Sequence, residues 1–221
     1  MASMIELKAA DGHKLAAYRA EPQGKPRGAV VVIQEIFGVN KHIKSVADGY
    51  AADGYLVIAP AMFDRLQRGY DTGYTPPEIE ARRALMQKAD WKQTMQDAAA
   101  AVEAAKAGGK VGIVGYCWGG TLAWLAATRL SVDCAVGYYG SMTIDFIDET
   151  PACPVTMMLG ETDASFPPEN IEAIRARHPD VVVFTYPAGH GFACDQRGSW
   201  HELSARLAGQ RTLEIFRRYL G

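Results

Sequence analysis

The chain has 221 residues, enough to bury one large core, and we expect a single domain over residues 1–221. Its 23 Lys and Arg residues against 25 Asp and Glu residues give a formal charge of −2 without a like-charge tail, which argues against nucleic acid as a partner. No stretch approaches the roughly 18 apolar residues of a membrane span, and the first residues lack the layout of a signal peptide, so we expect no membrane association and a soluble, cytoplasmic protein.

Short apolar runs alternate with longer helical patterns along the chain. Residues 4–9 and 14–19 are expected to form an antiparallel edge hairpin around the turn at Asp11-Gly12. Buried strands are predicted at residues 29–34, 56–59, 111–114, 134–138, 155–159 and 181–186. Helices are predicted at residues 41–53, 78–88, 90–107, 118–129, 168–177 and 200–219. This alternation predicts an α/β fold with a mostly parallel central sheet of about 7–8 strands and helices on both faces.

The segment from about residue 61 to 77 breaks this alternation. It is polar and irregular and contains the turn-forming pair Pro76-Pro77. We expect it to be a loop over the functional site.

Cys117 lies in the pattern Gly115-x-Cys117-x-Gly119, between an apolar strand and a helical segment. A sharp strand-to-helix turn needs small flanking residues and leaves its central side chain exposed. The start of a helix also favours a thiolate over a thiol. Cys117 is therefore predicted to be a nucleophile. Cys134 and Cys153, in or beside apolar strands, are expected to be inert.

Two later strand ends supply candidate partners for this thiol. Asp163 follows the strand at residues 155–159, and His190 follows the strand at residues 181–186. The order Cys117, Asp163, His190 matches nucleophile, acid and base, with His190 either taking the thiol proton or pairing with the thiolate. For Asp163 the alternative remains that this turn exists for its own hydrogen bonds, with Glu161 two residues away.

The other histidines are expected at the surface. His13 lies beside a turn and His178 precedes a proline, while His42 and His201 are expected to face solvent at helix starts. The four cysteines, which include Cys194, show no CxxC spacing and no disulfide framework. We expect no metal site and no cofactor.

Four separated motifs carry a resemblance to a known family. They are Gln34-Glu35-Ile36-Phe37-Gly38-Val39-Asn40, Gly115-Tyr116-Cys117-Trp118-Gly119-Gly120, Gly137-Tyr138-Tyr139-Gly140 and Ala188-Gly189-His190-Gly191-Phe192. In this order they resemble the dienelactone hydrolase family, the carboxymethylenebutenolidase-like branch of the α/β hydrolases, over almost the whole chain. The resemblance implies an α/β-hydrolase fold.

The same resemblance implies roles for individual residues. Cys117, His190 and Asp163 would form the catalytic triad, and the backbone amides of Ile36 and Trp118 would form the oxyanion hole. Glu35 would be a carboxylate that pairs with an arginine at rest and deprotonates the thiol once substrate displaces it. The alternative is that Glu35 only caps a turn.

The sequence also departs from the family pattern. The family's arginine four residues after the histidine is Cys194 here, and Gly191 stands where the better-known members have serine. Arg197 is close enough in sequence to substitute. The family's substrate-gripping residues have no clear counterparts in residues 62–91. Tyr139 is another candidate to bind substrate. So are the arginines of residues 62–91, although arginines on a polar helix can equally form only a solvent-exposed face; they are Arg65, Arg68, Arg82 and Arg83.

Together these features predict hydrolysis of a small ester or lactone through a thioester acyl-enzyme. A thiolate leaves more readily than an alkoxide, so activated aryl esters and enol lactones are favoured and simple amides are not. The alternatives are a catalytically weak ligand-binding or partner-binding relative and a redox-responsive thiol protein. We expect a monomer or a small homo-oligomer.

Overall fold

The computed structural model describes residues 1–221, apart from the side chains of residues 76 and 77. Its contacts divide the chain into two units. The first unit is Met1–Gly112 with Leu220, and the second unit is Ile113–Tyr219 with Gly221. Both units alternate strands with helices, as the sequence predicts for the α/β class.

The first unit contains four strands in the order β1-β2-β4-β3, namely β1 (Ala2–Lys8), β2 (Lys14–Ala20), β4 (Leu56–Pro60) and β3 (Ala29–Ile33). The predicted edge hairpin is confirmed, because β1 pairs antiparallel with β2 and Lys8 lies opposite Lys14. Gly12 has a φ of +90°, which favours glycine in the turn. The buried strands β3 and β4 are parallel.

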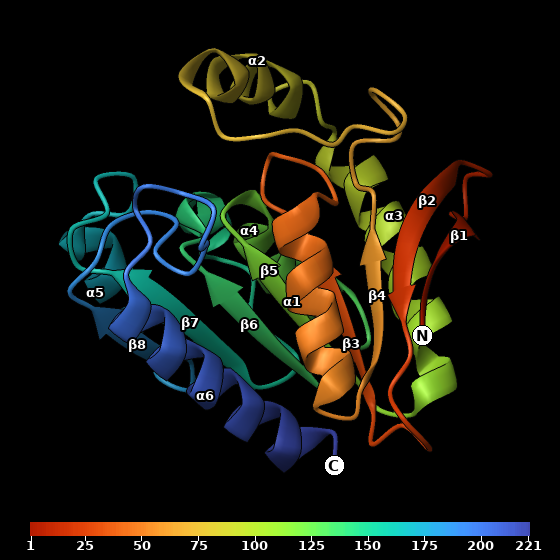
Figure 1. Cartoon of the computed structure of the whole chain (residues 1–221). Coiled ribbons are helices and arrows are strands. Elements are labelled where there is room, and N and C mark those ends of the chain that lie inside the picture. The colour runs from red at the N-terminus through yellow and green to blue at the C-terminus, as the bar shows by residue number, and fades with distance from the viewer. The chain divides into compact units, whose positions relative to one another are not determined.

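Helices cover both sides of these four strands. In Figure 1, α1 (Lys41–Ala52) lies in front of β3 and β4, and α3 (Trp91–Ala105) lies behind them. Each begins at a capping side chain: Asn40 accepts a hydrogen bond from Ile43 N–H at 3.1 Å, and Asp90 accepts one from Gln93 N–H at 2.8 Å. A short 3₁₀ helix, η1 (Lys106–Gly108), follows α3.

Residues 61–75 form an irregular segment, as expected, and α2 (Pro76–Met86) begins two residues earlier than predicted. The segment is fastened to the turn that follows β3. Gly38 pairs with Asp71, and the Asn40 amide donates to the Tyr74 hydroxyl at 2.8 Å. A Cβ atom at Gly38 would overlap the carbonyl oxygen of Tyr70, so this close approach requires glycine.

The second unit contains the strands β5 (Val111–Tyr116), β6 (Cys134–Tyr138), β7 (Val155–Gly160) and β8 (Val182–Tyr186), in that order. Strand β5 begins in the last two residues of the first unit. Strands β6, β7 and β8 run parallel, with Ala135 opposite Val155 and Thr156 opposite Val182. The carboxyl ends of β7 and β8, which the candidate acid and base follow, therefore lie at the same edge of the sheet.

The helices of the second unit also lie on both sides of its strands. Figure 1 shows α6 (Glu202–Tyr219) in front and α4 (Trp118–Arg129) behind. The unit also contains α5 (Pro168–Arg177) and a 3₁₀ helix, η2 (Ser141–Phe146), which the sequence patterns did not predict. No helix among the described residues combines the length and apolar character needed to cross a membrane.

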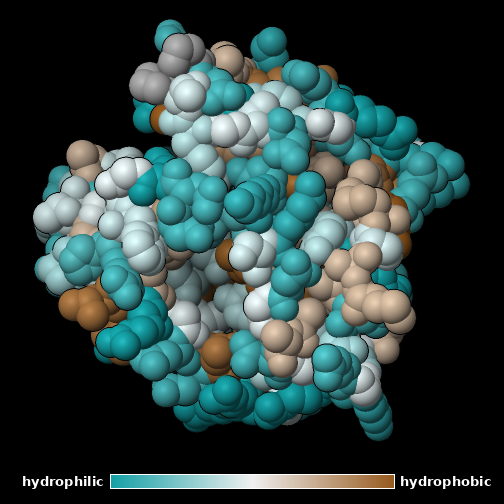
Figure 2. Space-filling view, viewed as in Figure 1, coloured by the Kyte–Doolittle hydropathy of each residue, from teal (hydrophilic) through white to brown (hydrophobic). Residues whose placement is uncertain are grey.

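Burial agrees with the sequence patterns for the inner strands and differs at the edge. Strands β3 to β7 are buried at every residue. Strand β8 was expected to be buried throughout, but Val182 is 47% exposed, because β8 is an edge strand. Figure 2 shows hydrophilic residues over most of the face in view, with apolar residues in small groups.

Two histidine predictions were wrong. His42 and His178 were expected at the surface, but both are buried. His178 directly follows the last residue of α5. Its ring lies edge-on to the Trp124 ring, with 5.1 Å between the ring centroids. Its Nε2 is bonded to the carbonyl oxygen of Ile147, which satisfies a polar atom that would otherwise oppose burial.

Candidate active site

Cys117 is the residue at which β5 turns into α4. Its φ of 56° and ψ of −118° lie outside the regions that L residues usually adopt. A Cβ atom at Gly115 would overlap the carbonyl oxygen of Gly119, so the strand and the helix touch through backbone alone. The sharp bend that the glycine pattern predicts is therefore present, and the Cys117 side chain is partly exposed.

The first turn of α4 packs against the end of β6. Gly120 lies very close to Tyr138 and Gly140. A Cβ atom on Gly120 would be 2.5 Å from the backbone carbonyl oxygen of Tyr138 and 3.0 Å from the α-carbon of Gly140. The same Tyr138 oxygen accepts a hydrogen bond from Cys117 N–H at 3.0 Å. These contacts explain the small residues in both motifs, and they fix the backbone that carries the thiol.

Asp163 lies in the turn after β7. Its side chain is 1% exposed, and Oδ2 lies 2.8 Å from Nδ1 of His190. Ser165 N–H donates to Oδ1 at 2.9 Å, and the Ser165 hydroxyl donates to the same oxygen. Both oxygens of this buried carboxylate therefore accept hydrogen bonds.

His190 lies in the loop after β8 and contacts both of the other candidates. Its Nε2 is 3.1 Å from Sγ of Cys117, while its Nδ1 faces Asp163. The structure thus brings together the three residues that chain order suggested, in a continuous series from sulfur to carboxylate. This arrangement can move a proton between the thiol and the imidazole.

The charges in this series reinforce one another. Burial opposes the charged form of His190. Its hydrogen bonds to Asp163 and Cys117 and its coulombic interactions with these two groups outweigh burial and raise the pKa of His190 to about 10. Burial also acts to raise the pKa of Asp163, yet the His190 and Ser165 hydrogen bonds hold that pKa below its usual value. A protonated imidazole next to an ionised carboxylate is therefore favoured at neutral pH.

Aromatic rings pack around the imidazole. The Tyr139 ring lies 5.1 Å from the His190 ring, edge to face, and 5.4 Å from the Phe192 ring. Tyr139 is fully buried and has a φ of 38°, which is uncommon for a residue with a side chain. It was predicted as a substrate-binding residue, and in the structure it packs against the base.

The remaining cysteines differ from Cys117. Burial raises the pKa of the Cys134 thiol far above its usual value and that of Cys153 to about 11. Cys194 is fully buried in the loop after His190. Burial that disfavours the thiolate agrees with the expectation that Cys134 and Cys153 are inert.

Arg197 lies against Gly191, the residue that follows the candidate base His190. A Cβ atom on Gly191 would be 2.5 Å from one guanidinium nitrogen of Arg197, so the guanidinium occupies the space that a side chain at residue 191 would need. The glycine that departs from the family pattern therefore leaves room for an arginine against residue 191, the residue after His190 in the chain.

Glu35 and Ile36 follow β3 in the first unit. The Glu35 side chain is buried, and one of its carboxylate oxygens lies within 4.8 Å of a ring nitrogen of His42. The Gln34 side chain connects this turn to the start of the irregular segment. Its Nε2 donates to the Glu35 carbonyl oxygen at 3.2 Å, and its Oε1 accepts from Met62 N–H at 3.1 Å.

The two arginines predicted in α2 differ from each other. Arg82 is 3% exposed, and it donates to the Tyr70 hydroxyl at 3.0 Å and to Gly73 O at 3.2 Å. Its guanidinium also lies over the Phe37 ring. Arg83 is exposed. Arg82 thus holds the irregular segment together instead of forming part of a solvated face.

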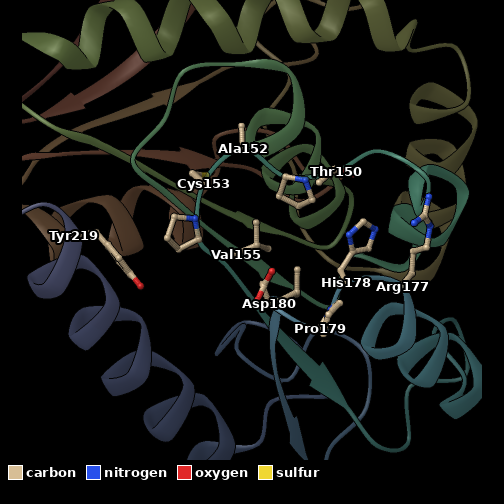
Figure 3. A pocket seen from close by; sticks show the side chains of 12 residues that line it. Thr150, Ala152, Cys153, Val155, Arg177, His178, Pro179, Asp180 and Tyr219 are labelled. Atoms are coloured by element: carbon tan, nitrogen blue, oxygen red, sulfur yellow. The ribbon is translucent and has the colours of Figure 1, made fainter.

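A cavity of about 490 Å³ opens at the amino ends of β7 and β8, where Cys153 precedes β7 and Asp180 precedes β8. Figure 3 shows Cys153 and Tyr219 on one side of it and Arg177 and His178 on the other. The candidate acid and base follow the opposite, carboxyl ends of these strands, so this cavity is separate from them.

Comparisons with known proteins show which family the chain resembles. A sequence model of the dienelactone hydrolase family matches residues 15–220. A protein of Synechocystis named "Putative carboxymethylenebutenolidase" is 34% identical over 94% of this chain and 93% of its own length, and one of the same name from Escherichia coli is 35% identical over 95% and 84%. The crystal structure of a "Putative Dienelactone Hydrolase" from Klebsiella pneumoniae has a TM-score of 0.87 and 30% identity, and covers 99% of this chain and 100% of its own.

Proposed function

Because the chain belongs to the dienelactone hydrolase family, and is thus a carboxylic ester hydrolase of the α/β-hydrolase fold, we propose that Cys117 is its nucleophile. His190 is the base, and Asp163 orients and charges the imidazole. The observation that carries this proposal is the series Sγ to Nε2 at 3.1 Å and Nδ1 to Oδ2 at 2.8 Å. It is the geometry that a nucleophile, its base and an orienting acid require.

In the first half of the reaction, the Cys117 thiolate attacks the carbonyl carbon of the ester while His190 holds the proton. The negative charge moves to the carbonyl oxygen. We propose that the amide of Trp118, the first residue of α4, donates a hydrogen bond to this oxygen, as the family resemblance implies. The family resemblance supplies the Ile36 amide as the second donor. The intermediate then collapses to a thioester, and the departing alkoxide takes the proton from His190.

In the second half, water replaces the alcohol. The now neutral His190 accepts a proton from a water molecule, which attacks the thioester carbonyl carbon. The carbon–sulfur bond breaks, the acid leaves, and the thiolate and protonated imidazole are restored. Because the first intermediate must expel an alkoxide in preference to a thiolate, the substrates are activated aryl esters or enol lactones.

Alkylation of Cys117 tests this assignment. We expect iodoacetamide to abolish hydrolysis of an activated aryl ester once one equivalent has reacted with the protein. Cys117→Ala should lower kcat by at least about 10³-fold, as loss of a nucleophile does. The half-exposed Cys153, whose pKa burial raises to about 11, provides the control, because Cys153→Ala should keep full activity. Turnover that survives complete alkylation of Cys117 refutes the nucleophile.

Glu35 is proposed as the general base that prepares the thiol. The support is its buried carboxylate at the end of β3 and the place of the residue in the family pattern.

Arg197 is proposed to bind a carboxylate of the substrate. Its guanidinium lies against Gly191, next to the base, and a guanidinium binds a carboxylate through two parallel hydrogen bonds. Arg82 donates hydrogen bonds to Tyr70 and Gly73 within the irregular segment, and Arg83 remains a candidate at the surface. We also propose a cytoplasmic location, which suits four free cysteines.

A matched pair of substrates tests Arg197. We expect Arg197→Met to raise KM about tenfold or more for an ester that carries a second carboxylate, because a charge-assisted contact is lost. The same variant should leave KM for the neutral methyl-ester analogue within about twofold. Equal changes for both substrates would exclude a role in carboxylate binding.

A further inference from the structure

Ser165 lies two residues after Asp163 and contacts both the candidate acid and the candidate base. Its N–H and its hydroxyl both donate to Oδ1 of Asp163. Its Oγ also lies 3.2 Å from Nδ1 of His190, the nitrogen that Oδ2 of Asp163 approaches at 2.8 Å. The atoms Oδ1, Oγ, Nδ1 and Oδ2 therefore form a closed ring of polar contacts.

The chemistry of a hydroxyl fixes the direction of these bonds. A hydroxyl has one proton and two lone pairs, and an ionised carboxylate only accepts. The Ser165 proton therefore goes to Asp163, and a lone pair of Oγ faces the N–H at Nδ1 of His190. The carboxylate cannot rotate away from the imidazole without breaking two bonds from Ser165.

The position of Ser165 relative to solvent adds to this effect. The Asp163 side chain is 1% exposed, whereas Ser165 is exposed. A turn at an aspartate needs only the bond from the backbone N–H two residues on. The hydroxyl contacts go beyond that turn, because they add a second donor to Oδ1 of Asp163 and also reach Nδ1 of His190.

We propose that Ser165 is a positioning residue, which holds the Asp163 carboxylate in the plane that faces His190 and donates to its second oxygen. Its importance for turnover rests on the proposed function of Cys117. Its effect on the carboxylate itself can be measured without any turnover.

The proposal predicts a change in the titration of Asp163. Burial acts to raise the pKa of this carboxyl, and the His190 and Ser165 hydrogen bonds act to lower it. In Ser165→Ala the hydroxyl bond is lost and the backbone bond remains, so the carboxyl should titrate at a higher pH than in the wild type. We also expect kcat to fall about tenfold or more with KM unchanged, as the loss of one hydrogen bond to a charged group implies.

Three variants and two readouts test it. The Asp163 carboxyl is titrated by ¹³C NMR, and kcat and KM are measured with an activated aryl ester, in Ser165→Ala, Ser165→Thr and Thr162→Ala. Ser165→Thr keeps the hydroxyl and should restore both readouts. Thr162→Ala is the matched control. Among the described residues, the Thr162 hydroxyl makes no hydrogen bond to Asp163 or His190, so both readouts in this variant should match the wild type.

A double-mutant cycle separates positioning from a general structural effect. In the Asp163→Ala background, Ser165→Ala should change kcat by less than about twofold, because the oxygen that accepts the Ser165 hydrogen bonds is gone. An Asp163 titration in Ser165→Ala that coincides with the wild type overturns the proposal, as does an equal loss of kcat in both backgrounds. If the wild type hydrolyses no ester but the titration still moves, the positioning stands and the proposed function fails.

Discussion

At the scale of single residues, His190 decides the charge of the candidate site. Its pKa of about 10 means that the imidazole already holds a proton at neutral pH. A protonated imidazole cannot take the proton of a neutral thiol. Either Cys117 rests as a thiolate paired with His190, or another base removes its proton when substrate binds.

Glu35→Gln distinguishes these two resting states. If Glu35 is the base, we expect the variant to lose about 10²-fold in kcat, as removal of a general base does, with its circular dichroism spectrum unchanged. The matched measurement is the ultraviolet absorbance of the thiolate, with Cys117→Ala as the blank. A thiolate already present in the wild type, with an unchanged rate in Glu35→Gln, would leave Glu35 a structural role.

The pH dependence of activity follows from His190 and Asp163. We expect kcat/KM to fall as the pH rises through about 10, because the imidazole then loses the proton that the leaving alkoxide needs. Asp163→Asn removes a hydrogen bond and a charge that raise this pKa, so its alkaline limb should move to lower pH. Profiles with identical alkaline limbs would contradict the assignment.

The same shift affects stability. The pKa of His190 lies above its ordinary value near 6.5, so its contribution to the free energy of unfolding is complete below that pH. The contribution is lost as the pH rises through about 10. Asp163 behaves in the opposite way, because its pKa is lowered: its contribution is present at neutral pH and is lost in acid.

Residue types with a fixed local pattern were predictable from the sequence, and long-range contacts were not. The glycines around Cys117 and the chain order of Asp163 and His190 identified residues that the structure brings together. Nothing local distinguishes Ser165 from other loop serines. His178 was predicted wrongly because its partner, Ile147, is 31 residues away and satisfies the ring through a backbone oxygen.

At the scale of elements, apolar runs predicted the strands well because inner strands of this class are buried on both faces. Edge exposure could not be predicted, since burial at β8 depends on whether another strand lies beside it. The six residues of η2 are too few to show a helical period. The true start of α2 did have a marker, because Thr75 and Glu78 form a capping box in which Thr75 N–H donates to Glu78 at 2.9 Å.

At the scale of the whole molecule, the three residues of the proposed triad all lie within the second unit, while Glu35 and Ile36 belong to the first. That one domain spans residues 1–221 stays a prediction, made from length alone. The family match over residues 15–220 includes residues of both units.

Unfolding in urea tests whether the two units form one domain. We expect a single transition at the same urea concentration by tryptophan fluorescence and by far-ultraviolet circular dichroism, as a cooperative domain gives. Of the four tryptophans, Trp91 alone lies in the first unit, so Trp91→Phe restricts the fluorescence to the second. Two separated transitions would show that the units unfold independently.

The unusual backbone at Cys117 bears on how such a site changes during evolution. A φ of 56° strains any L residue, at a cost of about 1–3 kcal/mol, whichever side chain it carries. With Cys117 as the proposed nucleophile, an exchange of sulfur for oxygen at this bend alters the reacting element without adding to the strain. One atom can redirect the chemistry towards different leaving groups, while the surrounding scaffold is inherited intact.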